Sequence, residues 1–508
     1  MSERQSPSPF SALAPHNPAI ALVEGDTQTS YAELNARVGQ LSSALLAGKD
    51  DLQEARIAIL LPASLHYVVS LHGIWLAGGI AVPLNPASQV PELEYFLANS
   101  GATDLLTAGD DPAALSELCD RLGVTLRSVD ALLHTGATLT PHKPTPLKPL
   151  TPNQNRRAMI LFTSGTTSKP KGVVITHASL AAQITTLTKA WCWQEQDVIP
   201  LFLPLHHIHG IVNILSCALW VGATVHLFPH FDLQRISQQV GQGSYTLFMG
   251  VPTIYVKLLE HLSRLNQADA EILCNGFRRM RLNVCGSAAC PKPLFEQWQS
   301  LTGQTLLERY GMTETGMIIS NPYTGERRPG HVGQALPGME VQLFDEHNAP
   351  LNQEDIAGEI RVKGEGVFQE YWNNPSATAK SFKQGWFCTG DIAILEAGYY
   401  RIIGRDQIDI IKSGGYKLSA LEIESTLLAH PDIAECAVIG VEDPLWGESV
   451  MAVIVLTEGR SLTYEALKHW CKGEMSAYKI PKAITKQSAL PRNAMGKVVK
   501  PALKKLLQ

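Results

Sequence analysis

The first 346 residues alternate short apolar runs with longer segments whose apolar residues recur at helical spacing. The stretch "SYAELNARVGQLSSALLA" has this helical spacing, whereas "ARIAILLP" and "GGIAVPLNP" are typical of buried strands. A connector rich in Thr and Pro, "TGATLTPHKPTPLKPLTPN", interrupts the alternation. Strand-like runs then resume with "AMILFT", "GVVITH", "TLFMGVP", "RLNVCG" and "TLLERYG". Strands that alternate with helices predict an α/β fold with mostly parallel sheets.

The pattern changes from about residue 357. The runs "GEIRVKG" and "YYRIIGR" alternate polar and apolar positions, as in a small antiparallel subdomain. Beyond Arg405, "DIIKSGGYKLSALEIESTLLAH", "IAECAVIGV" and "MAVIVL" indicate an α+β domain of about 100 residues. We therefore expect a large N-terminal multi-sheet α/β domain at 1–404, a small C-terminal α+β domain at 405–508, and a hinge near their junction.

Composition excludes several classes of protein. Hydrophobic residues make up 45% and charged residues 18%, and the net charge of −5 gives no reason to expect a nucleic-acid partner. No apolar run reaches the length of a membrane span. The start, "MSERQSPSPFSALAPHNPAIAL", matches neither a signal peptide nor a mitochondrial presequence. Nine scattered Cys indicate free thiols in a reducing compartment, so we expect a cytoplasmic protein.

The loop in "LFTSGTTSKPKGVVITH" (161–177) is the strongest candidate for chemistry. Its hydroxyls, backbone N–H groups and lysines could surround phosphate oxygens between two strands. It lacks the P-loop pattern, and the plain alternative is a polar hairpin loop. The candidate residues are Thr163, Ser164, Gly165, Thr166, Thr167, Lys169 and Lys171.

Other short motifs follow strand-like runs. In "ERYGMTET" the acid Glu314 could hold Mg²⁺ against phosphates, and Asp391 in "WFCTGDIA" could accept ribose hydroxyls. Lys497 lies in a Gly-marked turn, "LPRNAMGKVVK". Taken singly, each has an ordinary alternative: a surface acid, a turn residue or a solvated lysine.

Together and in this order, "TSGTTSKPKG", "YGMTET", "TGD", "GR…IKSGGYK" and "PRNAMGK" resemble the adenylate-forming superfamily. That superfamily contains acyl-CoA synthetases, luciferases and peptide-synthetase adenylation domains, and the resemblance covers about residues 12–505. It implies two steps: a carboxylate attacks the α-phosphorus of ATP–Mg²⁺, and a thiol, usually of CoA, then displaces AMP. It also implies that the C-terminal domain is mobile and rotates between the steps.

The resemblance implies a role for each matching residue. Lys497 would stabilise charge in the adenylation transition state, assisted by His207 and Thr163. Glu314 would bind Mg²⁺. Contacts to ATP would come from the 163–171 residues named above, Lys497, Gly286, Ser287, Ala288, Glu308, Tyr310, Gly311, Met312, Thr313, Asp391 and Arg405. CoA would meet Lys412, Ser413, Gly414, Gly415, Tyr416 and Lys417.

Two positions depart from the family pattern. The hinge motif reads "GRDQID", with one residue more than the usual motif, so the hinge is assigned only to 405–409. Met495 stands where Thr is common, two positions before Lys497. We expect little effect from Met495, because the lysine supplies the electrostatic work.

Arg309 indicates which kind of carboxylic acid is the substrate. An Arg in a closed acyl pocket is costly unless an anion pairs with it, and a second substrate carboxylate would be that anion. His207 and His209, in "LPLHHIHG", and Ser287 would join it, and Met317 would lie over the C2 carbon of the acid. A zinc site is the alternative for the His cluster, but adjacent His206 and His207 converge poorly on one metal.

The sequence around Arg309 looks specifically like that of the malonyl-CoA and methylmalonyl-CoA synthetases. We therefore predict an ATP-dependent ligase that joins malonate, or methylmalonate, to CoA. The alternatives are a ligase for another short or medium-chain acid, with Arg309 paired to Glu308 or another acid, an adenylation module that loads a carrier protein, and a non-catalytic ATP-binding relative. The sequence leaves monomer and homodimer open.

Overall fold

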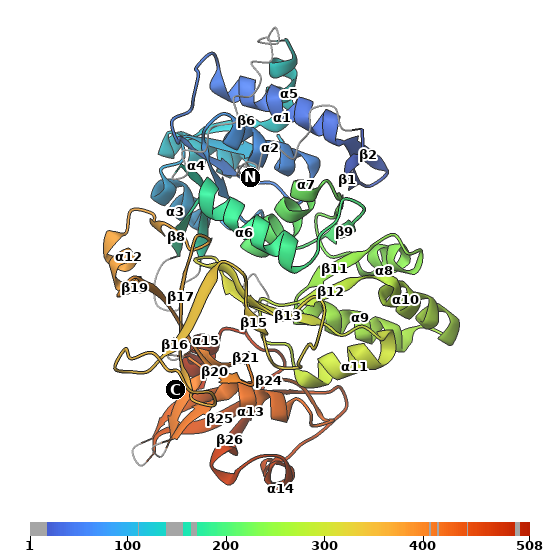
Figure 1. Cartoon of the computed structure of the whole chain (residues 1–508), viewed down its shortest axis with the longest axis vertical. Helices are drawn as coiled ribbons and strands as arrows, with labels where there is room; N and C mark the ends of the chain where they lie inside the picture. Colours follow the sequence, from blue (N-terminus) through green and yellow to red (C-terminus); the bar gives the residue numbers. More distant parts are fainter. Residues whose placement is uncertain are drawn as a thin grey trace, which may run out of the picture.

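The fold is given by a computed structural model, which describes residues 18–109, 111–138, 156–163, 170–405, 408–413, 416–443, 446–492 and 498–507. Figure 1 shows the N-terminal region at the top, a group of helices at the right, antiparallel strands in the middle and the C-terminal domain at the bottom. The expected α/β class is confirmed, with several sheets before residue 405.

A seven-stranded sheet forms the upper part of the molecule. Its central strands are parallel, and its last two pairings, β7 with β8 and β8 with β18, are antiparallel. In sheet order its strands are β18 (Glu370–Tyr371), β8 (Lys171–Thr176), β7 (Arg157–Thr163), β4 (Ile80–Pro83), β3 (Arg56–Ile59), β5 (Asp104–Thr107) and β6 (Thr125–Ser128). Its helices are α1 (Tyr31–Leu46), α2 (Leu65–Leu76), α3 (Val90–Ser100), α4 (Ala113–Leu122), α5 (Val129–Thr138) and α6 (His177–Ala190).

Local sequence explains where these helices begin and end. Ser30 and Glu33 form a reciprocal capping box at the start of α1, which satisfies backbone N–H groups that the helix leaves without partners. Helix α3 has Pro91 in its first turn and ends at Gly101, whose φ of 62° is the left-handed conformation that glycine adopts without strain.

A second, five-stranded sheet carries most of the candidate acid pocket. Strands β11, β12 and β13 run parallel, and β14 and β15 continue antiparallel. The strands are β11 (Leu247–Gly250), β12 (Leu282–Cys285), β13 (Leu307–Met312), β14 (Gly316–Ser320) and β15 (Gln334–Ala335). The helices that pack around it are α8 (Leu233–Gly241), α9 (Pro252–Arg264), α10 (Gln267–Arg279) and α11 (Lys292–Thr302).

A four-stranded sheet stands beside these two. Its order is β2 (Thr27–Ser30), β1 (Ile20–Glu24), β10 (Thr224–Leu227) and β9 (Val198–Leu201). Between β9 and β10 the chain forms a π-helix, η1 (His209–Ser216), and then α7 (Cys217–Val221). Short π-helical segments often mark functional sites, and this one begins at His209.

The predicted antiparallel subdomain is present. Its strands are β16 (Met339–Phe344), β17 (Gly358–Gly364), β19 (Phe382–Lys383), β20 (Trp386–Glu396) and β21 (Tyr399–Arg405), with α12 (Pro375–Ser381) before β19. The C-terminal domain has β22 (Ile410–Ser413), β23 (Tyr416–Ser419), β24 (Ile433–Asp443), β25 (Gly447–Leu456) and β26 (Ala483–Lys486), with α13 (Ala420–Leu427), α14 (Tyr464–Glu474), η2 (Ala477–Lys479) and α15 (Lys500–Leu507).

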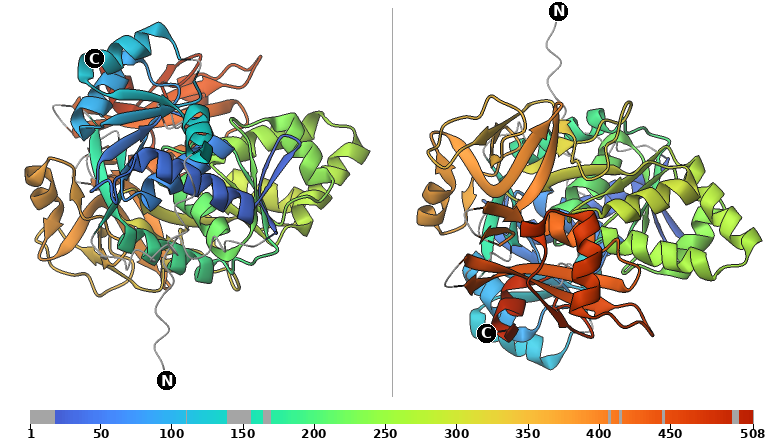
Figure 2. Two further views of the ribbon diagram at one scale, coloured as in Figure 1. Left: turned by 90° about the horizontal axis from the view of Figure 1, so that it is seen from above. Right: turned by 90° about the horizontal axis from the view of Figure 1, so that it is seen from below.

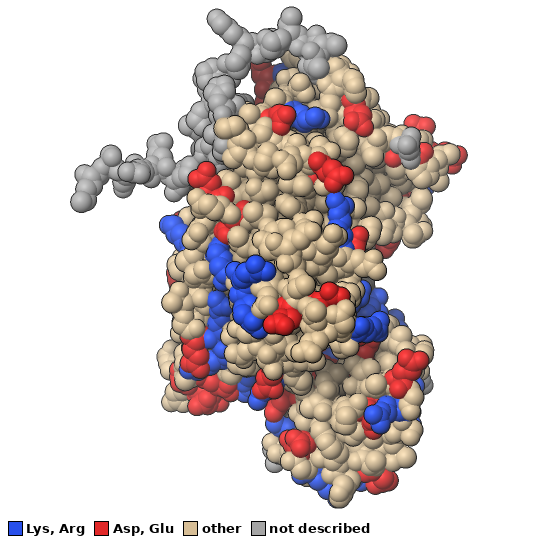
Figure 3. Space-filling view, turned by 90° about the vertical axis from the view of Figure 1, so that its right-hand side faces the viewer, with Lys and Arg blue, Asp and Glu red and all other residues tan. Residues whose placement is uncertain are grey.

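The C-terminal domain has hydrophobic cores of its own, which begin at Ile411, whereas the large N-terminal core extends to Tyr400. Figure 2 shows this domain, in red, against one side of the larger body. Figure 3 shows a notch at one edge of the molecule, and on the face that it draws Lys and Arg lie among Asp and Glu. Among the described helices, none is long and apolar enough to cross a membrane.

Candidate functional site

The β7–β8 hairpin places the two ends of the candidate phosphate loop side by side. Thr163 pairs with Lys171, and its hydroxyl donates to the Lys171 carbonyl at 3.5 Å. The residues between them that we predict at the phosphates, Ser164, Gly165, Thr166, Thr167 and Lys169, lie outside the described residues. The same holds for Gly414, Gly415 and Lys497, and for the side chains of Tyr416 and Lys417.

Glu314 lies in the turn between β13 and β14 and is held from a distant segment. The hydroxyl of Tyr371 donates to Glu314 Oε1 at 2.9 Å, and the ammonium of Lys171 lies 5.0 Å from the centre of the Tyr371 ring. Burial raises the pKa of the Glu314 carboxyl, while the Tyr371 hydrogen bond opposes that shift. Glu314, Tyr371 and Lys171 thus form one cluster at the edge of the seven-stranded sheet.

The cluster fits a magnesium ion better than a zinc ion. Among the described residues, no group of three or more His, Cys, Asp or Glu side chains could hold a metal. Mg²⁺ needs only one or two protein carboxylates when phosphate oxygens complete its shell, so Glu314 suffices for it. Zinc would need three or four protein ligands, which the His206–His209 cluster does not assemble.

Asp391 contacts two other residues that we predict at the nucleotide, Tyr310 and Arg405. Its Oδ1 accepts from Arg405 Nε at 2.9 Å, and its Oδ2 accepts from the Tyr310 hydroxyl at 2.5 Å. The Asp391 carboxyl is 6% exposed, and burial raises its pKa, while the nearby Arg405 opposes that shift. The three side chains come from β13, β20 and β21, so the antiparallel subdomain and the second sheet meet at this carboxylate.

Arg309 is buried without a carboxylate partner among the described residues. Only 4% of it is exposed, and Nη2 donates to Ser287 Oγ at 3.4 Å. Among the described residues, no carboxylate lies within 4.0 Å of the guanidinium, and Nε is buried without a partner. Burial lowers the pKa of Arg309 to about 10. A buried cation in this state is costly, and an anion that enters from outside would remove the cost.

His209 shares the Ser287 hydroxyl with Arg309. Its Nδ1 lies 3.1 Å from Ser287 Oγ, and its Nε2 is buried with no partner among the described atoms. Burial, reinforced by the charge of Arg309, holds the pKa of His209 well below its usual value, so the ring is neutral. Because the Ser287 oxygen accepts from Arg309, its proton can go to His209 Nδ1, and Nε2 then carries the ring proton as a donor.

The loop that holds Ser287 is tightly fitted. Ser287 has a φ of 67°, a conformation that costs a residue with a side chain about 1 kcal/mol or more. A Cβ placed on Gly286 would lie 2.6 Å from Arg309 Cζ, so the guanidinium rests directly on this backbone. Ala288, also predicted at the nucleotide, is exposed.

The other predicted residues that the structure describes come from several separate segments. The rings of His206 and His207 are 4.1 Å apart between centroids, and burial lowers the pKa of His206 to about 4. Lys412 and Ser413 lie in β22 of the C-terminal domain, where Lys412 is exposed. Gly311 and Met312 end β13, and Thr313 follows them.

Glu308 has partners inside the protein. Its carboxylate is buried and accepts from the Gly330 backbone N–H at 3.0 Å, and its carbonyl oxygen accepts from the backbone and side chain of Asn321. Its contact with the nucleotide stays a prediction. The pairing of Glu308 with Arg309, one of our alternatives, is wrong, because these side chains point to opposite faces of β13.

Comparison with known proteins identifies the family. Residues 11–372 match the AMP-binding enzyme family, and residues 422–497 match its C-terminal domain. The chain belongs to the AMP-binding enzyme family. Relatives of this AMP-binding enzyme include "Malonate--CoA ligase ACSF3, mitochondrial" of Mus musculus, which is 43% identical over 96% of this chain and 88% of the relative. "Malonate--CoA ligase" of Arabidopsis thaliana is 37% identical over 96% of this chain and 86% of the relative.

Solved structures of similar proteins support the same family. ATP-bound MatB from Rhodopseudomonas palustris has a TM-score of 0.89 at 32% identity and covers 99% of both chains. The apo form of that protein covers the same share at the same identity, with a TM-score of 0.79. The AMP-binding enzyme described here is therefore more similar in overall arrangement to the ATP-bound form.

Two contacts in this AMP-binding enzyme escape sequence reasoning. Tyr371 supports Glu314 from 57 positions away. The amide of Gln183, in α6, bonds the backbone of Thr315 and Met317 on both sides of Gly316. A Cβ on either Gly316 or Gly366 would lie 2.1 Å from this amide. These two glycines were the only sign of the Gln183 contact that we find in the sequence. Only the folded chain, however, places Gly366 beside Gly316.

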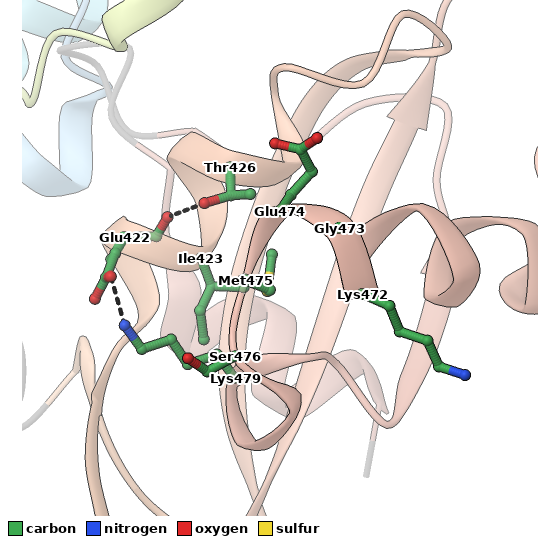
Figure 4. A pocket seen from close by; sticks show the side chains of 9 residues that line it. All are labelled: Glu422, Ile423, Thr426, Lys472, Gly473, Glu474, Met475, Ser476 and Lys479. Carbon is green, nitrogen blue, oxygen red and sulfur yellow. Dashed lines mark hydrogen bonds and ion pairs between the residues drawn. The ribbon is translucent and has the colours of Figure 1, made fainter.

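The C-terminal domain has a hollow that is separate from the candidate site, between α13, α14 and η2. The hollow has a volume of about 480 Å³. Figure 4 shows the side chains that line it, among which Lys479 pairs with Glu422 and the Thr426 hydroxyl donates to the Glu422 carbonyl. None of the predicted site residues that the structure describes lines this hollow. Its volume alone therefore gives it no role in the chemistry.

Proposed function

We propose that this enzyme is a malonate–CoA ligase. It would join malonate to AMP with release of pyrophosphate, and the thiol of CoA would then displace AMP to give malonyl-CoA. The relatives named above as malonate–CoA ligases support this proposal. The observation that carries it is the buried Arg309, which lacks a carboxylate partner among the described residues.

Malonate has one carboxylate that reacts and one that does not. The spare carboxylate would accept from the Arg309 guanidinium and from His209 Nε2. Arg309 Nε and His209 Nε2 are both buried and have no hydrogen-bond partner among the described residues. A monoacid of similar size would leave both donors unpaired, and each unpaired buried group costs about 1–3 kcal/mol. The pocket would therefore favour a diacid by electrostatics rather than by size.

The nucleotide would lie on the other side of β13. Asp391 would accept the ribose hydroxyls while Tyr310 and Arg405 hold its orientation. Glu314 would hold Mg²⁺, and the metal would neutralise charge on the phosphate oxygens. Thr163, Lys171 and the lysine at 497 would contact the phosphates, and the described arrangement of Thr163 and Lys171 at the hairpin base supports this placement.

The adenylation step would need a cation at the α-phosphorus. The attacking carboxylate and the pentacoordinate phosphorus are both negative, and Lys497 would stabilise them together. In the second step the CoA sulfur would attack the acyl carbon, and AMP would leave with the bonding pair. The face of Lys412 and Ser413 would receive the pantetheine arm.

Three finer points stay predictions. Met317 is 1% exposed, and its methyl group would lie 2.7 Å from a Cβ on Gly311, so a shorter residue there would change the room near the acid. Methylmalonate is therefore a second acid to test.

Location in the cytoplasm also stays a prediction, because several animal relatives are named as mitochondrial.

The test is a panel of acids with the wild type and Arg309→Met. We expect malonate to be the best substrate, and we expect kcat/KM for malonate to fall about 10²- to 10³-fold in the variant. Acetate and butyrate should change little. Arg327→Met, which removes a half-buried arginine bonded only to backbone carbonyls, is the matched control. A wild type that prefers a monoacid, or an Arg309→Met enzyme that keeps malonate activity, would refute the proposal.

A second candidate is an enzyme that loads a carrier protein instead of CoA. It shares the adenylation site, so only the acceptor distinguishes it. Turnover with a phosphopantetheinyl carrier but not with free CoA would favour it.

A further inference from the structure

Lys500 is a buried cation without an assigned role. It is the first residue of α15, and 7% of it is exposed. Its Nζ lies 2.5 Å from Asp409 Oδ1 and 2.6 Å from Glu424 Oε1. Glu424 Oε1 also accepts from the Val438 backbone N–H at 2.7 Å. Lys500 therefore ties together the junction segment, helix α13 and strand β24.

Asp409 extends this network to the predicted hinge. Its second oxygen, Oδ2, accepts from the Arg405 backbone N–H at 3.1 Å, and its own N–H donates to the Arg405 carbonyl at 2.8 Å. Arg405 in turn bonds Asp391. A continuous series of contacts thus runs from Asp391, in the nucleotide site, through Arg405 and Asp409 to Lys500.

The backbone at Gly404 leaves little freedom at Asp409. A Cβ on Gly404, whose φ is 136°, would lie 2.3 Å from Asp409 Cβ. Gly404 is therefore required where the Asp409 side chain closes over the chain. The carboxylate then has one oxygen for the hinge backbone and the other for Lys500.

Lys500 also follows the segment that contains Lys497. The two sides of that segment are joined just before Lys500, because Val499 N–H donates to the Pro491 carbonyl at 2.8 Å and Arg492 bridges Val498. Arg492 is further paired with Glu435 on β24 at 2.6 Å. The described ends of the segment are thus fixed to the C-terminal domain, and Lys500 is the fixed point that reaches the hinge.

We propose that Lys500 is a positioning residue for adenylation, and that its bond to Asp409 holds the base of the Lys497 segment in register with Arg405 at the hinge. This inference rests on the proposed function, since it assigns Lys497 to the first step. Lys500 itself would touch no substrate. Its effect would fall on the step that needs Lys497 and spare the thiol step, which uses the β22–β23 face.

The two half-reactions separate this role from plain support of the fold. Adenylation is measured by acid-dependent pyrophosphate exchange, and thiol transfer by CoA-thioester formation from a synthetic acyl-adenylate. For Lys500→Met we expect exchange to fall about 10- to 100-fold, with thioester formation within about twofold of wild type. Lys500→Arg should restore exchange, because Arg keeps the charge and reaches both carboxylates.

The control is Lys504→Met, one turn further along α15, which removes a half-buried contact to Glu448 at 3.6 Å and should alter neither step. If Lys500→Met fails to fold, the double variant Lys500→Met with Glu424→Gln takes its place. It leaves one buried carboxylate without a cation instead of two.

Equal loss of both half-reactions, or no loss in exchange, would overturn the inference. Exchange is measured with whichever acid the wild type activates best. A wrong substrate would therefore refute malonate as the acid while leaving the test of Lys500 in force.

Discussion

Glu308 and Arg309 are neighbours in β13, yet their charged groups serve opposite faces of the strand. The Glu308 carboxylate accepts from the backbone of Gly330, and the Arg309 guanidinium lies against Gly286 and Ser287. Successive residues of a strand point to opposite sides, so the pair cannot neutralise itself. This geometry leaves the cation of Arg309 for a substrate and gives the acid of Glu308 a structural task.

Glu308 should make stability depend on pH. Burial raises the pKa of its carboxyl to about 8, against 4.5 in the unfolded chain. The folded state therefore holds an extra proton between these values, and stability falls as the pH rises from 4.5 to 8, by about 1.4 kcal/mol per pH unit at most. In Glu308→Gln this loss should be absent. Thermal unfolding at pH 5.5, 7 and 8.5 measures it, and equal slopes for both proteins would contradict the prediction.

Two substitutions of Ser287 should distinguish the role of its hydroxyl in malonate binding from the strain of its backbone conformation. Both Ser287→Ala and Ser287→Gly remove the hydroxyl between Arg309 and His209, so both should lower kcat/KM for malonate, by about tenfold. Only glycine relieves the φ of 67°, so the Gly variant should unfold at a higher temperature than the Ala variant. Malonate titrations and melting curves of the two variants test this, and equal melting temperatures would argue against strain.

Tyr371 should control the metal. Tyr371→Phe removes the donor that orients Glu314, and we expect the half-saturating Mg²⁺ concentration to rise about tenfold at fixed ATP. The control is Tyr245→Phe, since the buried Tyr245 hydroxyl has no partner among the described residues. A metal titration that is unchanged in Tyr371→Phe would remove Glu314 from the magnesium site.

Gly286 should influence the choice of acid through Arg309. A Cβ at Gly286 would lie 2.6 Å from Arg309 Cζ and would displace the guanidinium, so Gly286→Ala should weaken malonate activity more than monoacid activity. Gly39→Ala is the control: its Cβ meets nothing within 4 Å in the middle of α1, and it should slightly stabilise the protein. The same acid panel reads both variants, and a uniform loss over all acids would contradict the prediction.

Much of the fold was readable from the sequence because its signals are local. Alternating runs such as "ARIAILLP" became β3, and "YYRIIGR" became β21. The motif residues Tyr310, Asp391 and Arg405 could be assigned to one site by resemblance, and they do meet. The contacts of Tyr371 with Glu314, of Gln183 with Thr315 and Met317, and of Lys500 with Asp409 could not be foreseen. Each of them joins segments whose pairing depends on packing across the whole chain.

The short strand β18 has a consequence for synthesis of the chain. Glu370 and Tyr371 pair with Val174 and Val173 on the edge of β8, about 200 positions earlier. At ribosomal speeds of 5–20 residues per second, that edge would wait roughly 10–40 s for its partner. An uncovered edge strand invites pairing with other chains. The nascent protein would therefore be most prone to aggregate in this interval, before the last strand of its largest sheet arrives.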